Sequence, residues 1–538
     1  MNYSNATASK QHPSSLESVA EPHLPPEEDT NPHRTKLVLI LFSYIALIGV
    51  FSAFHEIWRD EMRALNIVRE SSDFLEVVSR LRNEGHPLLW YALLNLAYSV
   101  FQSTIVLKLC ALASAAAAAA IFLFRAPFPL LLRLLWLAGF YPAYEYSVMC
   151  RNYGIGMFCL FAAAACYRKR IDSPWKLALC LSLAALTSAY GIIHVVAFAA
   201  ALILEPIFCT SVRTKKAMKS LYFAGLTALG AAAVSLWTIF PERTTSVTEL
   251  HSLSLQDILQ AAVVGALNHG SSFHNALVSP YPLIVPLVLV GVYTLLLKSP
   301  AAIVYLFSVV VGMEMFNSLV YSGAALRHQG FLLLGIIIAV WLSRTNALAP
   351  NLRVGPLSER FAQRLLNIGI AVLLLLQTVP AYRAIKSDLL FPRSSAAALA
   401  DFVQSHSDYQ HAVIAAEPDV ALESLPYYLN NSTYLVREKR FGSVVSFTTV
   451  SNPQLSLDEL ISELTQLSAK RNQPVLLLLP PSIEAKSTIS VGYDRTLEVS
   501  SKGLVQLNSE SQKLACFEGA LTDENYCAWL INYRHLKS

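Results

Sequence analysis

Acidic and basic side chains gather in a few short segments of this sequence, and the first of these directly follows the first long apolar run. Residues 55–61 read HEIWRDE, and residues 84–91 read EGHPLLWY. A carboxylate at a lipid–water boundary can accept the proton of a hydroxyl group that is aligned for attack. The acidic pair Asp60 and Glu61 is therefore a candidate for acid–base chemistry. The alternative interpretation is that the pair only caps and solvates a surface helix.

A second segment combines aromatic residues with one arginine. Residues 144–153 read YEYSVMCRNY, at the predicted outer boundary of the membrane. A charge near bilayer depth costs free energy, so Arg151 needs an anion or the headgroup region. A phosphate group would satisfy its guanidinium through two hydrogen bonds. The alternative is that Arg151 pairs with Glu145 or reaches to the lipid headgroups.

A third segment, residues 322–330, reads SGAALRHQG and places Arg327 and His328 at the outer end of a predicted helix. Glu314 lies on the preceding apolar segment, below its outer end. A buried carboxylate requires a partner, and Arg327 or His328 is a natural one. The alternative interpretation of this segment is a structural ion pair.

The composition shows which elements must position these groups. The chain has 538 residues, of which 54% are hydrophobic and 14% charged, and its mean hydropathy is +0.45. Soluble domains carry about 25% charged residues, so most of this chain must face lipid. The net charge of +4 is too small to argue for a nucleic-acid partner.

Apolar runs of about 17 to 22 residues can cross a bilayer as helices. We place them near 36–54, 134–149, 152–167, 176–190, 192–210, 220–240, 281–297, 300–320, 329–343 and 365–381. The apolar region 86–124 contains at least one more, which we expect near 105–124, with 86–103 lying partly along the outer interface. The sequence therefore predicts a polytopic α-helical membrane protein with about eleven transmembrane helices.

Clusters of Lys and Arg indicate which loops face the cytoplasm. They occur at 168–170, 213–219 and 344–364. The helix count between them then places 55–85, 241–280, 321–328 and the tail from Tyr382 onward on the opposite side. The candidate residues consequently fall at one membrane face: Asp60, Glu61, His86, Arg151, Arg327 and His328.

Three domains follow from the composition. Residues 1–35 are polar and are expected to form a disordered cytoplasmic tail, 36–382 the transmembrane module, and 383–538 a soluble extracytoplasmic α/β domain. Residues 412–416 and 474–479 suit buried strands, and the SLDE sequence at 456–459 is a capping box. A disulfide between Cys516 and Cys527 is one of two open alternatives for these cysteines.

These motifs together resemble the GT-C superfamily of membrane glycosyltransferases, in its protein O-mannosyltransferase and aminoarabinose-transferase-like branch. The likeness covers about residues 36–382. It rests on RDE at 59–61, EGHPLLWY at 84–91 and CRNY at 150–153. Leu88 and Cys150 depart from the branch, which has a second proline and a serine at these places.

The resemblance implies a sugar donor on a polyprenyl phosphate and an acceptor hydroxyl of a protein, lipid or glycan. Asp60, with Glu61 beside it, would be the general base of an inverting transfer. The residues for the donor phosphate would be Arg151, Arg327 and His328, and those for binding substrate His86, Tyr91 and Tyr153.

The sequence also bears on metal binding, on location and on alternative functions. No ligand spacing supports a metal, although His269 and His274 lie in the long loop 241–280 and leave a divalent ion open. We expect the bacterial inner membrane. The main alternative function is a transporter or flippase of lipid-linked saccharides, which would need polar residues at both membrane faces. A non-catalytic scaffold and a polymerase or ligase of the same superfamily are further alternatives.

Overall fold

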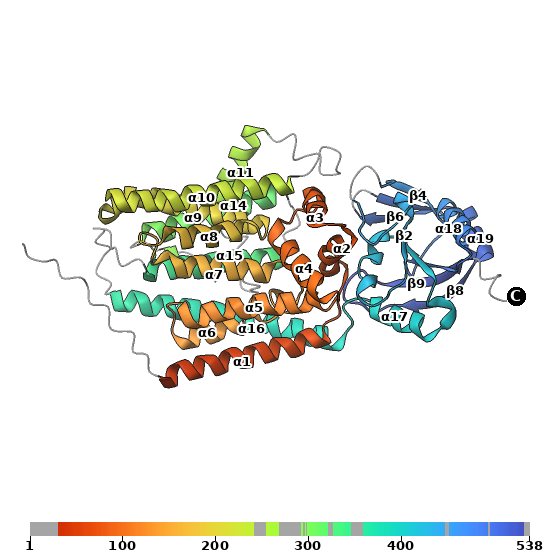
Figure 1. The fold of residues 1–538 in the computed structure, drawn as a ribbon, viewed down its shortest axis with the longest axis horizontal. Helices are drawn as coiled ribbons and strands as arrows, with labels where there is room; N and C mark the ends of the chain where they lie inside the picture. The colour runs from red at the N-terminus through yellow and green to blue at the C-terminus, as the bar shows by residue number, and fades with distance from the viewer. Residues whose placement is uncertain are drawn as a thin grey trace, which may run out of the picture.

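The computed structural model describes residues 31–240, 254–267, 292–293, 296, 299–320, 326–345, 359–446, 451–492 and 495–531. In Figure 1 the helices α1, α5 to α10 and α14 to α16 lie side by side as one body, and the strands form a second body at one end. We call these the membrane part (residues 31–390) and the tail (residues 391–531). Helices α2 to α4 lie between the membrane helices and the tail.

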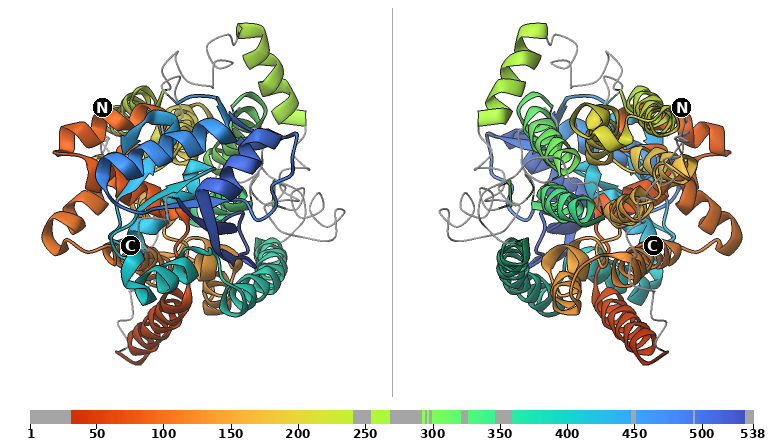
Figure 2. Two further views of the ribbon diagram at one scale, coloured as in Figure 1. Left: turned by 90° about the vertical axis from the view of Figure 1, so that its right-hand side faces the viewer. Right: turned by 90° about the vertical axis from the view of Figure 1, so that its left-hand side faces the viewer.

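Seven described helices are long and apolar enough to cross a membrane. They are α1 (Asn31–Phe54), α5 (Val106–Arg125), α9 (Ala189–Phe208), α10 (Lys215–Ile239), α14 (Pro300–Leu319), α15 (Leu326–Thr345) and α16 (Glu359–Leu390). Figure 2 shows this bundle from its two ends. The prediction of a polytopic α-helical membrane protein is confirmed. The number of about eleven crossings stays a prediction, because most of the expected segment 281–297 lies outside the described residues.

Shorter helices fill the rest of the membrane part. They are α2 (Arg59–Glu70), α3 (Phe74–Arg80), α4 (Leu88–Phe101), α6 (Leu130–Leu137), α7 (Tyr153–Tyr167), α8 (Pro174–Ala185) and α11 (Leu255–Leu267). The region 86–124 divides into α4 and α5, as expected. Gln102, in the left-handed conformation (φ 46°), ends α4.

Two expectations for the membrane part were wrong in detail. Residues 134–149 do not form one helix: α6 ends at Leu137 and a single π-helical turn, Tyr141–Glu145, follows. Pro142 lies at the start of this turn, and proline cannot donate the backbone hydrogen bond that would continue α6. The expected loop 241–280 contains helix α11, which packs along α14. His269 and His274 lie outside the described residues.

The tail is built on two sheets. The larger has the strand order β3-β2-β1-β5-β9-β8, in which β1 pairs in parallel with β2 and β5, while β9 is antiparallel to both β5 and β8. Its strands are β1 (Val413–Ala416), β2 (Thr433–Leu435), β3 (Arg440–Phe441), β5 (Val475–Leu479), β8 (Ser511–Phe517) and β9 (Tyr526–Ile531). The smaller sheet consists of β4 (Gln454–Ser456), β7 (Arg495–Val499) and β6 (Ser487–Gly492).

Successive residues of a strand face opposite sides of a sheet, and each side of the larger sheet carries its own apolar core. Ile414 and Leu476 pack with α17 (Ala396–Ser405), whereas Val413 and Leu477 pack with α18 (Leu457–Arg471). The third tail helix is α19 (Ser501–Glu510). The predicted strands at 412–416 and 474–479 are confirmed. So is the capping box, in which Ser456 and Glu459 bind each other's backbone N–H groups.

Candidate active site at the junction of α2, α7 and α15

Helix α2 begins a few residues after the end of α1, and Glu61 contacts the backbone of its first turn. The fully buried Glu61 carboxylate accepts hydrogen bonds from the backbone N–H groups of Trp58 (3.3 Å) and Cys150 (2.5 Å). It also lies 2.9 Å from His55 Nε2. With all these partners inside the protein, Glu61 holds α2 against the turn before α7. These contacts make Glu61 a structural link between α2 and that turn, and its predicted catalytic role stays a prediction.

Asp60 points the other way and meets two arginines from distant parts of the chain. Its Oδ2 atom lies 2.7 Å from Arg151 Nη1 and 3.4 Å from Arg327 Nη2. Arg151 lies in the turn before α7, and Arg327 in the first turn of α15. We call these three side chains the Asp60 site. The two alternative partners considered for the arginines, Glu145 for Arg151 and Glu314 for Arg327, make no such ion pair among the described residues.

The site is partly open and its charges are unbalanced. The side chains of Asp60, Arg151 and Arg327 are 26%, 10% and 24% exposed. Burial by itself would raise the pKa of Asp60, but Arg151 and Arg327 outweigh it and lower that pKa below its ordinary value. Asp60 is therefore an ionised carboxylate beside two permanent cations, and the three side chains sum to one positive charge. An anionic ligand would neutralise them.

Asp60 also has a second oxygen, Oδ1, which faces a third arginine at a longer distance. Arg59 Nε lies 3.9 Å from Oδ1, beyond a hydrogen bond. The guanidinium of Arg59 is instead occupied by Asp523 of the tail, at 2.7 and 2.8 Å. One oxygen of the candidate base is thus held by the arginines of the site, while the other remains able to accept a proton.

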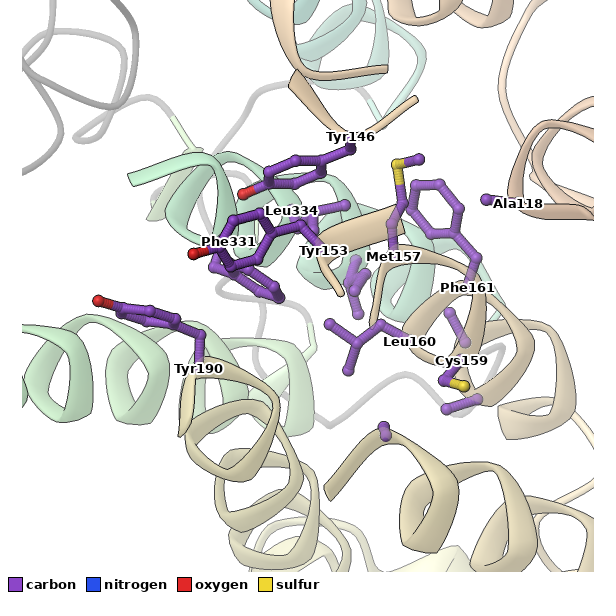
Figure 3. Close-up of a cluster of buried hydrophobic side chains, with 14 of the residues drawn as sticks. Ala118, Tyr146, Tyr153, Met157, Cys159, Leu160, Phe161, Tyr190, Phe331 and Leu334 are labelled. Atoms are coloured by element: carbon purple, nitrogen blue, oxygen red, sulfur yellow. The ribbon is translucent and has the colours of Figure 1, made fainter. Parts of the chain in front are cut away.

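Aromatic side chains contact Arg327 and the neighbouring His328. Tyr146 donates its hydroxyl hydrogen to the backbone carbonyl of Arg327 (2.7 Å). His328 Nε2 lies 3.1 Å from the hydroxyl of Tyr153, and its ring stacks on Tyr190 with centroids 4.7 Å apart. In Figure 3 the hydroxyl groups of Tyr146, Tyr153 and Tyr190 point to one side, away from the apolar side chains around Phe161. The polar edge of this core therefore faces the first turn of α15.

The remaining predicted residues lie at different distances from the site. His86 Nδ1 lies 3.5 Å from the side-chain amide of Asn152, next to Arg151. Burial, followed by the charges of Arg151 and Arg327, lowers the pKa of His86 to about 3, so the imidazole is neutral. Tyr91 is buried in α4 and makes no hydrogen bond to the three side chains of the Asp60 site among those described.

Several polar residues attach α2 to the tail, and none of these contacts was predicted from the sequence. Arg63 binds Glu84 through two hydrogen bonds (2.6 and 2.7 Å) and also contacts Glu423 of the tail. Asn66 donates to the carbonyl of Glu423 (2.7 Å), and Ser443 donates to Glu70. Residues 59, 63, 66 and 70 are spaced by four, three and four positions. This polar stripe with helical period was the available signal.

One group of potential metal ligands occurs in the described part of the chain. Only Cys516, Glu518 and Cys527 have ligand atoms close enough together in the described part of the chain, and both cysteines are joined in a disulfide. A disulfide sulfur is no longer a thiolate ligand. No such group of three ligands lies at the Asp60 site among the described residues.

Fold and site together define a polytopic membrane protein with a carboxylate and two arginines where its helices meet a mixed α/β tail. No protein-family model matches the chain, and no curated protein matches its sequence. Among solved structures, the chain is similar to ArnT from Cupriavidus metallidurans bound to undecaprenyl phosphate, with 13% identity and a TM-score of 0.50. The match covers 92% of this chain and 98% of ArnT.

The apo state of the same ArnT matches over the same shares of both chains, with a TM-score of 0.48. At this identity the likeness concerns the fold. The undecaprenyl phosphate-bound ArnT structure shares the overall fold over 92% of this chain, and this chain has the predicted order of a helical membrane part followed by an α/β tail.

Proposed function

We propose that this protein is a membrane glycosyltransferase that moves a sugar from a polyprenyl-phosphate donor to an acceptor hydroxyl, with Asp60 as the general base. The observation that carries the proposal is the ion-pair cluster in which Asp60 meets Arg151 and Arg327. The cluster carries one surplus positive charge. A sugar phosphodiester carries one negative charge, so its binding would leave the site neutral.

In the proposed reaction, the acceptor hydroxyl gives its proton to Asp60 and its oxygen forms a bond to the anomeric carbon of the sugar. The bond from that carbon to the phosphate oxygen breaks, and its electron pair leaves with the phosphate. Attack from the side opposite the phosphate inverts the anomeric configuration. Arg151 and Arg327 would stabilise the charge that develops on the leaving phosphate.

Donor binding would also activate the base. Arg151 and Arg327 both lower the pKa of Asp60. A phosphate that draws the two guanidinium groups toward itself would weaken that effect and make Asp60 a stronger base. The likeness in fold to ArnT, whose structure contains undecaprenyl phosphate, supports a lipid-linked donor.

We further propose that the Asp60 site and the tail lie on the extracytoplasmic side of a bacterial inner membrane. The clusters of Lys and Arg at the opposite ends of the helices support this orientation. So does the Cys516–Cys527 disulfide, because disulfides persist in oxidising compartments.

The test is transfer by the purified protein in lipid nanodiscs. A panel of polyprenyl-phosphate pentoses and hexoses would be combined with lipid, glycan and protein fractions of the cell envelope, and released polyprenyl phosphate measured. We expect turnover by the wild type and a loss of about 100-fold or more in Asp60→Asn. Asp458→Asn, in helix α18 of the tail, is the matched control and keeps full activity.

Two results would contradict the proposal. Wild-type turnover that persists in Asp60→Asn would remove Asp60 as the base. Movement of the intact donor across a liposome membrane, with no transfer to any acceptor, would favour the alternative of a transporter or flippase.

A further inference from the structure

A loop of the tail reaches the first turn of α2, next to Asp60. It comprises residues 518–525, between strands β8 and β9, and the disulfide Cys516–Cys527 joins the two strands next to it. The loop is also bound to the segment that joins α16 to α17. The Leu521 N–H group donates to the backbone carbonyl of Pro392 (2.9 Å). The Thr522 hydroxyl group donates to the backbone carbonyl of Arg393 (2.8 Å).

Glu524 is the buried acid of this loop, with 1% of its surface exposed. Its Oε1 atom accepts a hydrogen bond from the backbone N–H of Arg59 (3.1 Å), the first residue of α2. The first N–H groups of a helix have no acceptor inside the helix. Glu524 thus supplies one from the tail, and its charge suits the positive end of the helix dipole.

The adjacent Asp523 acts on the same residue. It binds both terminal nitrogens of the Arg59 guanidinium, whose Nε atom lies 3.9 Å from Asp60. Arg59 is therefore fixed at its backbone by Glu524 and at its side chain by Asp523. Asp60 is the next residue in the chain. The loop contacts to Arg59 therefore help to determine the position of the Asp60 side chain.

We propose that Glu524 is a positioning residue for Asp60: the tail holds the first turn of α2 through it, and the transfer step depends on that contact. This inference rests on the proposed function. Misplacing a catalytic group by about 1 Å can cost up to about 100-fold in rate. The phosphate contacts come from Arg151 and Arg327, outside this loop, so donor binding should not depend on Glu524.

The protonation state of Glu524 provides the specific readout. Burial raises its pKa to about 7, against the lowering influence of Arg59. The charged or titratable groups around it are Arg59 on α2, Asp523 in its own loop, Glu56 before α2 and Tyr526 on β9. As pH falls through about 7, Glu524 gains a proton and the anionic contact to α2 is lost.

The experiment compares the wild type with Glu524→Gln as full-length proteins in nanodiscs. We expect wild-type kcat to fall as pH decreases through about 7. Glu524→Gln should lack this step and show kcat about tenfold lower at pH 8, with the donor KM within about twofold of wild type. The exposed Glu518→Gln, in the same loop, should keep the wild-type profile. Glu524→Asp, which keeps the charge, should retain the step.

Three results would overturn the inference: wild-type kcat in Glu524→Gln at pH 8, a step near pH 7 that persists in that variant, or a donor KM that rises as much as kcat falls. If Glu524→Gln does not fold, a step missing from Glu524→Asp overturns it instead. Failure of the proposed function is distinguishable, because it would appear as no transfer by the wild type with any donor.

Discussion

At the scale of single residues, Arg151 and Arg327 reduce the basicity of Asp60, the candidate base. The two arginines keep the carboxylate ionised, but they also occupy its Oδ2 atom at 2.7 and 3.4 Å. An ionised Asp with a lowered pKa is a weak proton acceptor. The arrangement suits a base that becomes effective only when a phosphate competes for the same guanidinium groups.

Arg151 should therefore affect donor use more than acceptor use. We expect Arg151→Ala to raise the KM for the polyprenyl-phosphate sugar and lower kcat/KM for it by about 10- to 100-fold, because a charge-assisted contact to phosphate is lost. The KM for the acceptor should stay near the wild-type value. Steady-state kinetics with each substrate varied in turn is the measurement.

Arg151→Lys is the informative companion variant. Lysine keeps the positive charge but cannot form the planar pair of hydrogen bonds, so it should recover only part of the loss. Equal effects of Arg151→Ala on both substrates would show that this arginine is only structural. Arg344→Lys, at the other end of α15 from Arg327, is the control for a general effect on the membrane part.

At the scale of elements, α2 serves as the link between the membrane helices and the tail. One side of its first turn carries Asp60, while its polar stripe binds Glu423, Ser443 and Asp523. His55, just before α2, lies 2.8 Å from Asp388 at the end of α16 and 2.9 Å from Glu61. Three elements are thus tied together within a few residues of the candidate base.

The pH dependence of stability should report the His55 contacts. Burial opposes the charged imidazole, but Glu61 and Asp388 outweigh it and raise the pKa of His55 to about 9 from an ordinary 6.5. A raised pKa stabilises the fold fully below pH 6.5, and this stabilisation is lost as pH rises toward 9. We expect about 3 kcal/mol to be lost over that window, measured as a fall in Tm.

His55→Gln can accept and donate hydrogen bonds but does not titrate between pH 6.5 and 9. Its Tm should be lower than that of the wild type at pH 6.5 and should change less up to pH 9. A wild-type Tm that is flat across the window would contradict the assignment of a charged His55.

Arg63 should be the most sensitive contact between α2 and the tail. Its side chain is 15% exposed, and its partners Glu84 and Glu423 are 7% and 3% exposed. Removing one partner of a buried ion pair leaves the other charges without compensation and costs about 3–5 kcal/mol. We expect Arg63→Ala to lose stability in this range in denaturant or thermal unfolding.

An exposed ion pair of the same chain provides the comparison for Arg63. Lys216 and Asp172 are 74% and 72% exposed, so Lys216→Ala should cost less than about 1 kcal/mol. Equal effects of the two substitutions would contradict the role of Arg63 as a buried link.

At the scale of the whole molecule, the sequence predicted the order of the parts better than their contacts. Apolar runs located α5, α9 and α14, and short apolar stretches located β1 and β5. These signals are local, because each depends on the length and composition of one segment. The end of α6 at Leu137 was not predicted. The run is apolar on both sides of Pro142, so its composition suggested one continuous helix.

The sequence predicted at which membrane face the site residues lie, but not which of them are in contact. Positive-inside topology assigned Asp60, Arg151 and Arg327 to one face, but it gives no lateral distance between them. The contacts of Glu61 with His55 and Cys150 were not predicted, because these pairs become evident only in three dimensions. The tail residues that hold α2 follow it by more than three hundred positions, as with Glu423 and Asp523. No periodicity connects such pairs.

The Cys516–Cys527 disulfide should affect both the stability of the tail and the position of α2. Cys516 and Cys527 face each other on β8 and β9 and close a loop with a sequence separation of 11. Without the bond, the unfolded chain gains conformational freedom worth about 2–4 kcal/mol. The loop that carries Asp523 and Glu524 also loses its tether. We expect the double variant Cys516→Ser, Cys527→Ser to show a lower Tm and a lower kcat at unchanged donor KM.

Reductant should act on the wild type in the same direction and leave the double variant unaffected. The other cysteines, Cys110, Cys150, Cys159, Cys166, Cys180 and Cys209, are free thiols, so a reductant has no further bond to break in the chain. Wild-type kcat and Tm in the double variant would show that strand pairing alone fixes the loop. A loss of kcat that exceeds the loss expected from unfolding at the assay temperature would instead mean that the tail acts on the transfer step through α2.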